Sequence, residues 1–100
     1  MAQFFHGTSS ENLHSIMENG LVGGINLTEN RTKNTDVVFL TTNYQSAVGY
    51  AGRSRTKVGG TAIILVINST KARSWKNKKG CTIFIVKNVP AEEIVEIKKL

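Results

Sequence analysis

The first histidine of the chain, His6, stands in a short motif whose residue types suit the binding of a small polar ligand. It follows two phenylalanines and precedes Gly7 and Thr8, in the stretch FFHGTSS. An imidazole, the backbone amides of a glycine and a hydroxyl side by side can hold the hydroxyl and amide groups of a ligand. A histidine beside two phenylalanines is also common in a core or on a surface without any such role. The residues alone leave both interpretations of His6 open.

Basic residues are concentrated in one block of the sequence. The net charge is +6, and the segment 53–87 carries nine lysines or arginines and no acidic residue. Such a block often contacts phosphates, because each phosphate that a protein neutralises releases counterions. A solvated basic face that only aids solubility is the alternative. The residues expected to contact nucleic acid or another acceptor are Arg53, Arg55, Lys57, Lys76, Lys78 and Lys79.

Length and composition predict a single domain over residues 1–100, with 40% apolar and 20% charged residues. The longest apolar run, AIILVI, is far shorter than the roughly 20 residues that span a membrane. The N-terminal MAQFFHG has neither the basic region nor the long apolar region of a secretory signal. We therefore expect a cytoplasmic protein with no membrane partner. One cysteine and two histidines cannot complete a closed zinc site, so no metal is expected.

The apolar pattern predicts an α+β fold. Strands are expected at AQFF, VVFLT, CTIFIV and EIVEI, with a brief one within residues 25–28. The stretch TAIILVIN is β-branched and continuously apolar, which is typical of a central strand covered on both faces. A short amphipathic helix is expected after a serine N-cap, Ser9 or Ser10, and ends at Gly20.

A second short helix is expected after the strand VVFLT. Thr42 and Gln45 have the spacing of a capping box, and Gly52 is expected to end the helix. Segments 53–60 and 69–80 are expected to be basic loops. His6 is expected where the first strand ends.

The order of these motifs resembles the ADP-ribosyltransferase fold, the NAD-cleaving family that includes the poly(ADP-ribose) polymerases and the tRNA 2'-phosphotransferases. The motifs are FHGTSSENLHSIMENGL, VVFLTTNYQSAVGYAGR, AIILVIN and GCTIFIVKNVPAEEIVEI, and together they cover nearly the full length. The resemblance implies a compact domain with a bent antiparallel sheet, split into two facing halves, and two short helices. It also implies that NAD is a co-substrate.

The resemblance implies a role for each residue of the motifs. His6 would hydrogen-bond a hydroxyl of the nicotinamide ribose, while the Gly7 backbone and the Thr8 hydroxyl hold the carboxamide. Tyr50 looks like the family tyrosine that stacks on the nicotinamide ring, for which its flat face is suited. The alternative is that Tyr50 covers the seam between helix and sheet. Arg53 stands where the 2'-phosphotransferases place a phosphate-binding arginine.

The position of a catalytic carboxylate depends on how the last motif is aligned. A carboxylate near the ribose would stabilise the oxocarbenium-like sugar that forms when the nicotinamide bond breaks. One alignment matches AEEIVEI and selects Glu92, which completes a catalytic set with His6 and Tyr50. The alignment of the 2'-phosphotransferases matches GCTIFIV instead, and it selects Cys81 or Thr82, neither of which is a carboxylate.

Three functions are consistent with these motifs. The first is a NAD-dependent ADP-ribosyltransferase that modifies a protein or nucleic acid. The second is an RNA 2'-phosphotransferase-like enzyme in which Arg53 holds the phosphate. The third is a non-catalytic module that binds nucleic acid or protein through residues 53–87. Two departures bear on the choice: Val38 replaces a tyrosine of the polymerases, and the further arginine from an N-terminal lobe of the 2'-phosphotransferases has no counterpart in these 100 residues.

Overall fold

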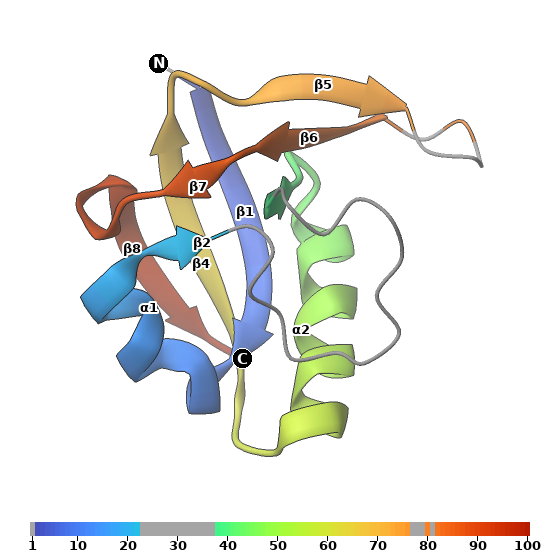
Figure 1. The fold of residues 1–100 in the computed structure, drawn as a ribbon. Helices are drawn as coiled ribbons and strands as arrows, with labels where there is room; N and C mark the ends of the chain where they lie inside the picture. The colour runs from blue at the N-terminus through green and yellow to red at the C-terminus, as the bar shows by residue number, and fades with distance from the viewer. Residues whose placement is uncertain (1, 23–37, 77–79, 81) are drawn as a thin grey trace.

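A computed structural model describes residues 2–22, 38–76, 80 and 82–100 (Figure 1). Within these residues the chain forms two three-stranded antiparallel sheets, a two-stranded antiparallel pair and two α-helices. The α+β class, the antiparallel strands and the two helices predicted from the sequence are therefore confirmed.

The strands of the two larger sheets lie side by side in the following order. The first sheet is β1 (Ala2–Ser9), β4 (Ala62–Ser69) and β8 (Ile94–Lys99), with β4 in the middle. The second sheet is β3 (Val38–Leu40), β6 (Thr82–Val86) and β5 (Arg73–Lys76), with β6 in the middle. The remaining elements are the pair β2 (Leu21–Val22) and β7 (Asn88–Val89), the helices α1 (Leu13–Asn19) and α2 (Tyr44–Val58), and the 3-10 turns η1 (Ser10–Asn12) and η2 (Ala91–Glu93).

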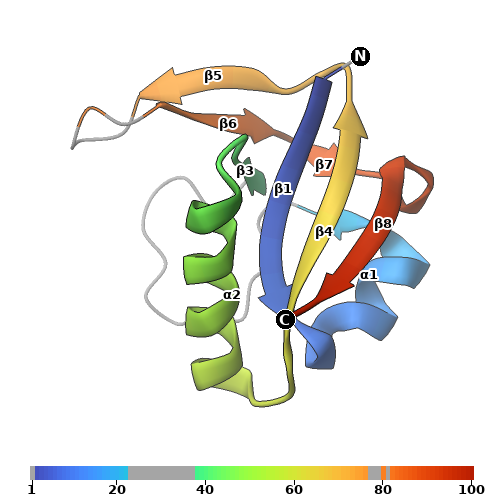
Figure 2. The ribbon, with the colours of Figure 1, turned by 180° about the vertical axis from the view of Figure 1, so that it is seen from behind.

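Strand β4 is covered on both faces, as its apolar sequence predicts. Leu65 and Ile67 belong to the larger core cluster, which also contains Ile16 of α1. Ile64 belongs to a second cluster with Ala47 and Ala51 of α2. The two helices thus pack on opposite faces of the first sheet (Figures 1 and 2). Because β1 pairs with β4 along its whole length, this packing also fixes the position of the His6 motif.

Helix α2 is longer than expected from the sequence. It passes through Gly52 and ends at Val58, where Gly59 adopts the left-handed φ of 85°. A glycine inside a helix costs only about 1 kcal/mol relative to alanine. Ala51 is fully buried against the sheet and Val58 is partly buried, so packing on both sides of Gly52 outweighs that cost. The expected basic loop at 53–60 is therefore mostly helix.

The N-terminus of α2 is capped by a different residue from the one expected. The N-cap is Asn43, whose side-chain oxygen accepts the Ser46 N–H at 3.0 Å. The expected cap, Thr42, is exposed, whereas the preceding Thr41 accepts the Asn43 N–H at 3.0 Å. Asparagine is as good an N-cap as threonine or better, so the helix begins one residue later than the capping-box spacing suggests.

Two other expectations are corrected. β1 continues to Ser9, so His6 lies inside a strand and pairs with Leu65 rather than standing at the strand exit. The expected loop at 69–80 contains β5, which pairs with β6 and has all four residues exposed. The expected end of the first helix at Gly20 is confirmed. Ser9 caps the 3-10 turn η1 rather than α1, whose N-cap is Asn12. The brief strand expected within 25–28 lies outside the described residues.

Candidate functional site

In the described part of the chain, the two larger sheets are joined by one isolated bridge, between Phe5 of β1 and Thr41, the residue that follows β3. The Phe5 N–H donates to the Thr41 carbonyl at 2.7 Å, and the Thr41 N–H donates to the Phe5 carbonyl at 3.0 Å. Alternate residues of a strand direct their N–H and C=O groups to opposite edges. Gly7 therefore directs its backbone groups to the same edge as Phe5. No described residue pairs with Gly7 on that edge. We call this place, where β1 and β3 separate beyond the bridge, the split. It leaves the N–H of Gly7 as a donor and its C=O as an acceptor.

His6 spans this split with its side chain. Its Nδ1 lies 2.9 Å from the Phe39 carbonyl oxygen on β3. A carbonyl only accepts, so Nδ1 carries the hydrogen and Nε2 of the neutral ring is an acceptor. Burial lowers the pKa of His6 below its ordinary value of 6.5, and the bond to Phe39 opposes this shift only in part. At neutral pH the ring is therefore uncharged, with a lone pair on Nε2 able to accept a hydroxyl hydrogen.

The lowered pKa of His6 predicts that acid destabilises the fold. As the pH falls below 6.5, the unfolded chain takes up a proton at this ring that the folded chain does not. The resulting loss of stability is at most about 1.4 kcal/mol per pH unit. We expect the melting temperature to fall between pH 7.5 and 5.5, and to fall less in a His6→Asn variant.

Gly7 lies closer to α2 than any other residue type could. A Cβ at this position would meet the Ala47 carbonyl oxygen at 2.0 Å and the Ala51 nitrogen at 2.6 Å. Both atoms belong to the helix backbone and cannot rotate away. The absence of a side chain therefore brings the backbone of α2 against β1 beside the split.

Thr8 follows on the same face of β1 as His6, because side chains alternate along a strand. It is buried, and its hydroxyl oxygen accepts a hydrogen bond from the Asn12 side-chain amide at 3.0 Å. A threonine hydroxyl that accepts one bond still has its own hydrogen to donate. Thr8 is thus held in place by η1 while keeping a donor.

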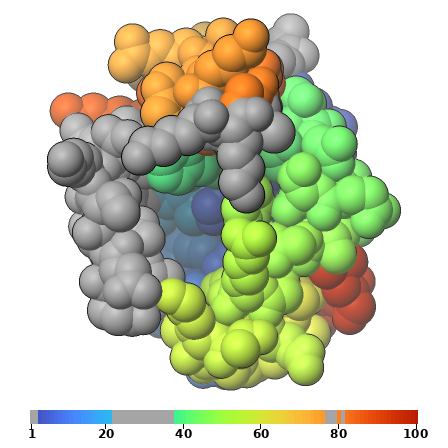
Figure 3. All heavy atoms as spheres, turned by 90° about the vertical axis from the view of Figure 1, so that its right-hand side faces the viewer, coloured from blue at the N-terminus to red at the C-terminus, as the bar shows by residue number. Residues whose placement is uncertain are grey.

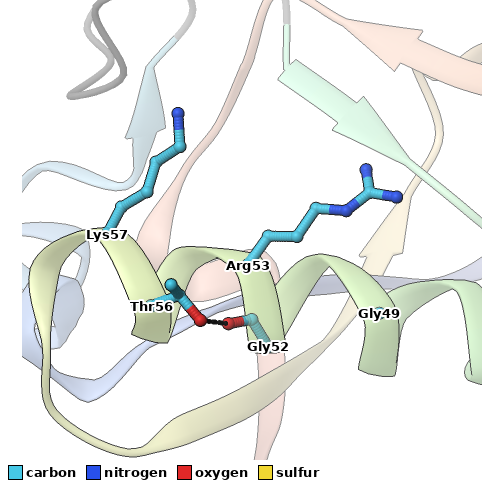
Figure 4. Close-up of a pocket in the computed structure, with 5 residues that line it drawn as sticks. All are labelled: Gly49, Gly52, Arg53, Thr56 and Lys57. Carbon is cyan, nitrogen blue, oxygen red and sulfur yellow. Dashed lines mark hydrogen bonds between the residues drawn. The ribbon is translucent and has the colours of Figure 1, made fainter.

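One flank of α2 carries an aromatic ring and two cations. Tyr50 is 43% exposed, and the Arg53 guanidinium lies 5.6 Å from the centre of its ring. This is the geometry of a cation–π contact. Lys57 follows Arg53 at helical spacing, and the two side chains extend from the same side of the helix (Figure 4). Tyr50 is thus partly exposed beside Arg53.

A hollow of about 390 Å³ opens beside these cations. Its described lining is Gly49, Gly52, Arg53, Thr56 and Lys57 (Figure 4). All five described lining residues belong to α2, which lies at the surface in Figure 3 with β5 above it. The two glycines leave open space, and the Thr56 hydroxyl donates to the Gly52 carbonyl at 2.9 Å. An open hollow with two cations is suited to an anionic group.

The other basic candidates do not all join this hollow. Arg55 is exposed, but two residues along a helix from Arg53 it projects to a different flank. Lys76 is exposed on β5. Lys78 and Lys79 lie outside the described residues.

Glu92 is not brought together with the other catalytic candidates. It is exposed in η2, within the connection between β7 and β8. In both ribbon views this connection lies at the end of the molecule away from α2, which carries Tyr50 and Arg53 (Figures 1 and 2). In the alternative alignment, Thr82 is the first residue of β6 and pairs with Lys76, while Cys81 lies outside the described residues.

Two residues of this region are missing from the sequence candidates. Phe39 contributes its carbonyl oxygen, and a backbone acceptor leaves no side-chain signal in a sequence. Trp75 is 37% exposed on β5, next to basic residues. The stretch RSWK, in which an aromatic residue stands among cations, could have indicated Trp75, but the segment was expected to be a loop.

Compared with known proteins, the chain matches no family model and no curated protein. None of the described helices is long and apolar enough to cross a membrane. In the described part of the chain, no three histidine, cysteine or acidic residues lie close enough together to bind a metal ion.

Proposed function

We propose that the domain is a NAD-dependent ADP-ribosyltransferase. The observation that carries this proposal is the split between β1 and β3, with the neutral ring of His6 beside it and with backbone groups of Gly7 that no described residue pairs. A primary carboxamide has one acceptor and two donors. It can therefore take the N–H and the C=O of Gly7 at once. The Nε2 of His6 accepts a hydroxyl of the attached ribose, and the Thr8 hydroxyl supplies a further donor.

The hollow beside α2 would receive the phosphates of NAD. A guanidinium can bind two phosphate oxygens at once, and an ammonium adds a point charge. Arg53 and Lys57 are both at this hollow. Tyr50 would stack on the nicotinamide ring with the face that Arg53 does not cover, since an aromatic ring has two faces.

The reaction breaks the bond between nicotinamide and ribose C1', and the bonding electron pair leaves with nicotinamide. A nucleophilic oxygen or nitrogen of the acceptor forms the new bond to C1' with its own electron pair, and any proton that it carried passes to solvent. The contribution of this chain is to hold the two halves of NAD so that C1' is exposed to the acceptor.

A second candidate is an RNA 2'-phosphotransferase-like enzyme, and the position of Glu92 favours it. A carboxylate near C1' would assist an acceptor hydroxyl by polarising it, whereas a phosphate is already anionic and gains less from one. Glu92 lies away from α2, and Thr82 at the start of β6 is not acidic. Arg53 would then hold the reacting phosphate.

The test is incubation of the protein with labelled NAD and a cell lysate, followed by nuclease or protease. Label that is lost with protease or with nuclease supports transfer to protein or to nucleic acid, respectively. Loss of a 2'-phosphate from a synthetic RNA, dependent on NAD, supports the second candidate. If the protein neither binds nor cleaves NAD at millimolar concentration, both enzyme proposals fail and a non-catalytic module remains.

Two substitutions distinguish a catalytic role of the Glu92 carboxylate from a phosphate-binding role of Arg53. We expect Glu92→Gln to leave NAD turnover within about twofold, because its exposed carboxylate is far from α2. We expect Arg53→Ala to weaken NAD binding by roughly 10- to 100-fold, the usual effect of losing a hydrogen bond to a charged group. The adjacent Glu93→Gln is the control for Glu92. A loss of about 100-fold in Glu92→Gln alone would instead assign the catalytic carboxylate to Glu92.

A further inference from the structure

We infer that β5 binds single-stranded nucleic acid, with Trp75 stacking on an unpaired base and Arg73 and Lys76 contacting phosphates. This rests on the proposed function only in that the bound strand would be the acceptor presented to the hollow beside α2. The binding site itself requires no NAD chemistry.

Trp75 is placed as a stacking platform. It is 37% exposed, and its ring centre lies 6.1 Å from that of Phe39, with 39° between the two planes. Its partner across the ladder is Ile83, which is partly buried. One side of the indole is therefore supported by the second sheet while the other reaches solvent. A supported, exposed ring stacks on any unpaired base, because every base has a flat π-face.

Cations flank this ring along the strand. Arg73 lies on the same face of β5 as Trp75, because residues two apart share a face. Lys76 follows Trp75 and projects to the opposite face, and both cations are exposed. β5 is an edge strand of its sheet, so a chain can lie along it from the solvent side. A single strand that stacks on Trp75 therefore has a cation available on either side.

The charge distribution favours a polyanion over a protein partner. No acidic residue occurs between positions 53 and 87. The described acidic residues belong to η1, α1, η2 and β8. Glu11 of η1 lies beside Gly60, just beyond the C-terminal end of α2, whereas η2 lies at the end of the molecule away from that helix (Figures 1 and 2). β5 also lies above α2 in Figure 3, the helix whose Arg53 and Lys57 line the hollow. A bound strand would thus lie along the basic side, with one end near the hollow.

Trp75 is the only tryptophan of the chain, so its fluorescence reports directly on stacking. The probes are ten-residue oligomers of uridine and of thymidine, a duplex of the same length, inorganic polyphosphate and an acidic peptide. We expect both single-stranded oligomers to quench Trp75, and their affinity to fall steeply with salt. Comparable quenching by polyphosphate or by the acidic peptide would overturn the inference, as would stronger binding of the duplex.

Variants are tested by anisotropy of a fluorescein-labelled thymidine oligomer, which does not depend on the tryptophan. We expect Trp75→Leu to weaken binding about 10-fold or more, Trp75→Phe to retain most of it, and Lys76→Glu to weaken it. Lys99→Glu on β8 is the matched control and should stay within about twofold. Thermal melts establish that each variant is folded. A Trp75→Leu variant that binds within twofold of the wild type would overturn the inference.

The two proposals fail separately. Oligonucleotide binding without NAD turnover would contradict the proposed function and leave the β5 site standing. NAD turnover without oligonucleotide binding would contradict the β5 site alone.

Discussion

Gly7→Ala is expected to lower the free energy of unfolding by about 3 kcal/mol or more, enough to unfold many domains of this size. The new methyl group would overlap the Ala47 carbonyl oxygen and the Ala51 nitrogen. Because both are backbone atoms inside α2, relief requires moving the whole helix away from β1. Urea denaturation followed by circular dichroism measures the effect.

The control for this prediction is Gly52→Ala in the same helix. A Cβ at Gly52 meets nothing within 4 Å, so the change only improves helix propensity. We expect it to raise stability by up to about 1 kcal/mol. If Gly7→Ala were as stable as the wild type, the close approach of α2 to β1 would not exist in the protein.

His6→Asn is expected to reduce NAD turnover by about 100-fold or more while the domain stays folded. In both side chains a nitrogen is bonded directly to Cγ, so asparagine can keep the donor to the Phe39 carbonyl. It has no counterpart of Nε2, the atom that would accept the ribose hydroxyl. Loss of one preorganised contact of this kind typically costs two to three orders of magnitude in rate. Turnover of labelled NAD and the melting temperature are measured together.

His6→Ala gives the comparison that separates the two roles of this residue. Alanine removes Nε2 and also leaves the Phe39 carbonyl without its donor, so we expect an additional loss of about 1–3 kcal/mol in stability. If His6→Asn turned NAD over at the wild-type rate, the ring would serve only to tie β3 to β1. The structural interpretation of His6 would then replace the catalytic one.

Much of the fold could be predicted because the strongest patterns in the sequence are runs of apolar residues, which indicate buried elements. The continuous apolar run of β4 has no stable place except between two packed layers, and β4 occupies that place. The turn at Gly20 was also predictable, since its φ of 75° favours glycine. The end of α2 was not, because Gly52 weakens a helix only slightly and the packing of Ala51 beside it involves Ile64, which is distant in sequence.

The candidate site was predictable only where a side chain carries the signal. His6, Gly7 and Thr8 form a motif that can be seen in the sequence, and they lie on consecutive positions of one strand. The carbonyl of Phe39 and the unpaired edge of Gly7 depend on where β1 and β3 separate, which is a property of the fold. The distance between Glu92 and α2 likewise follows from the connection of β7 to β8, which the alternative alignments could not decide.

The bridge between Phe5 and Thr41 also determines which substitutions the split tolerates as the sequence diverges. Both of its hydrogen bonds join main-chain atoms, so no particular side chain is needed at either position to hold the two sheets together. Substitution there can change the packing around the junction while the separation of β1 and β3 persists. Proline is the exception, because it has no N–H to donate. The separation of β1 and β3 beside His6 is therefore encoded by the path of the backbone, and two sequences can share it without sharing the residues at the point where it begins.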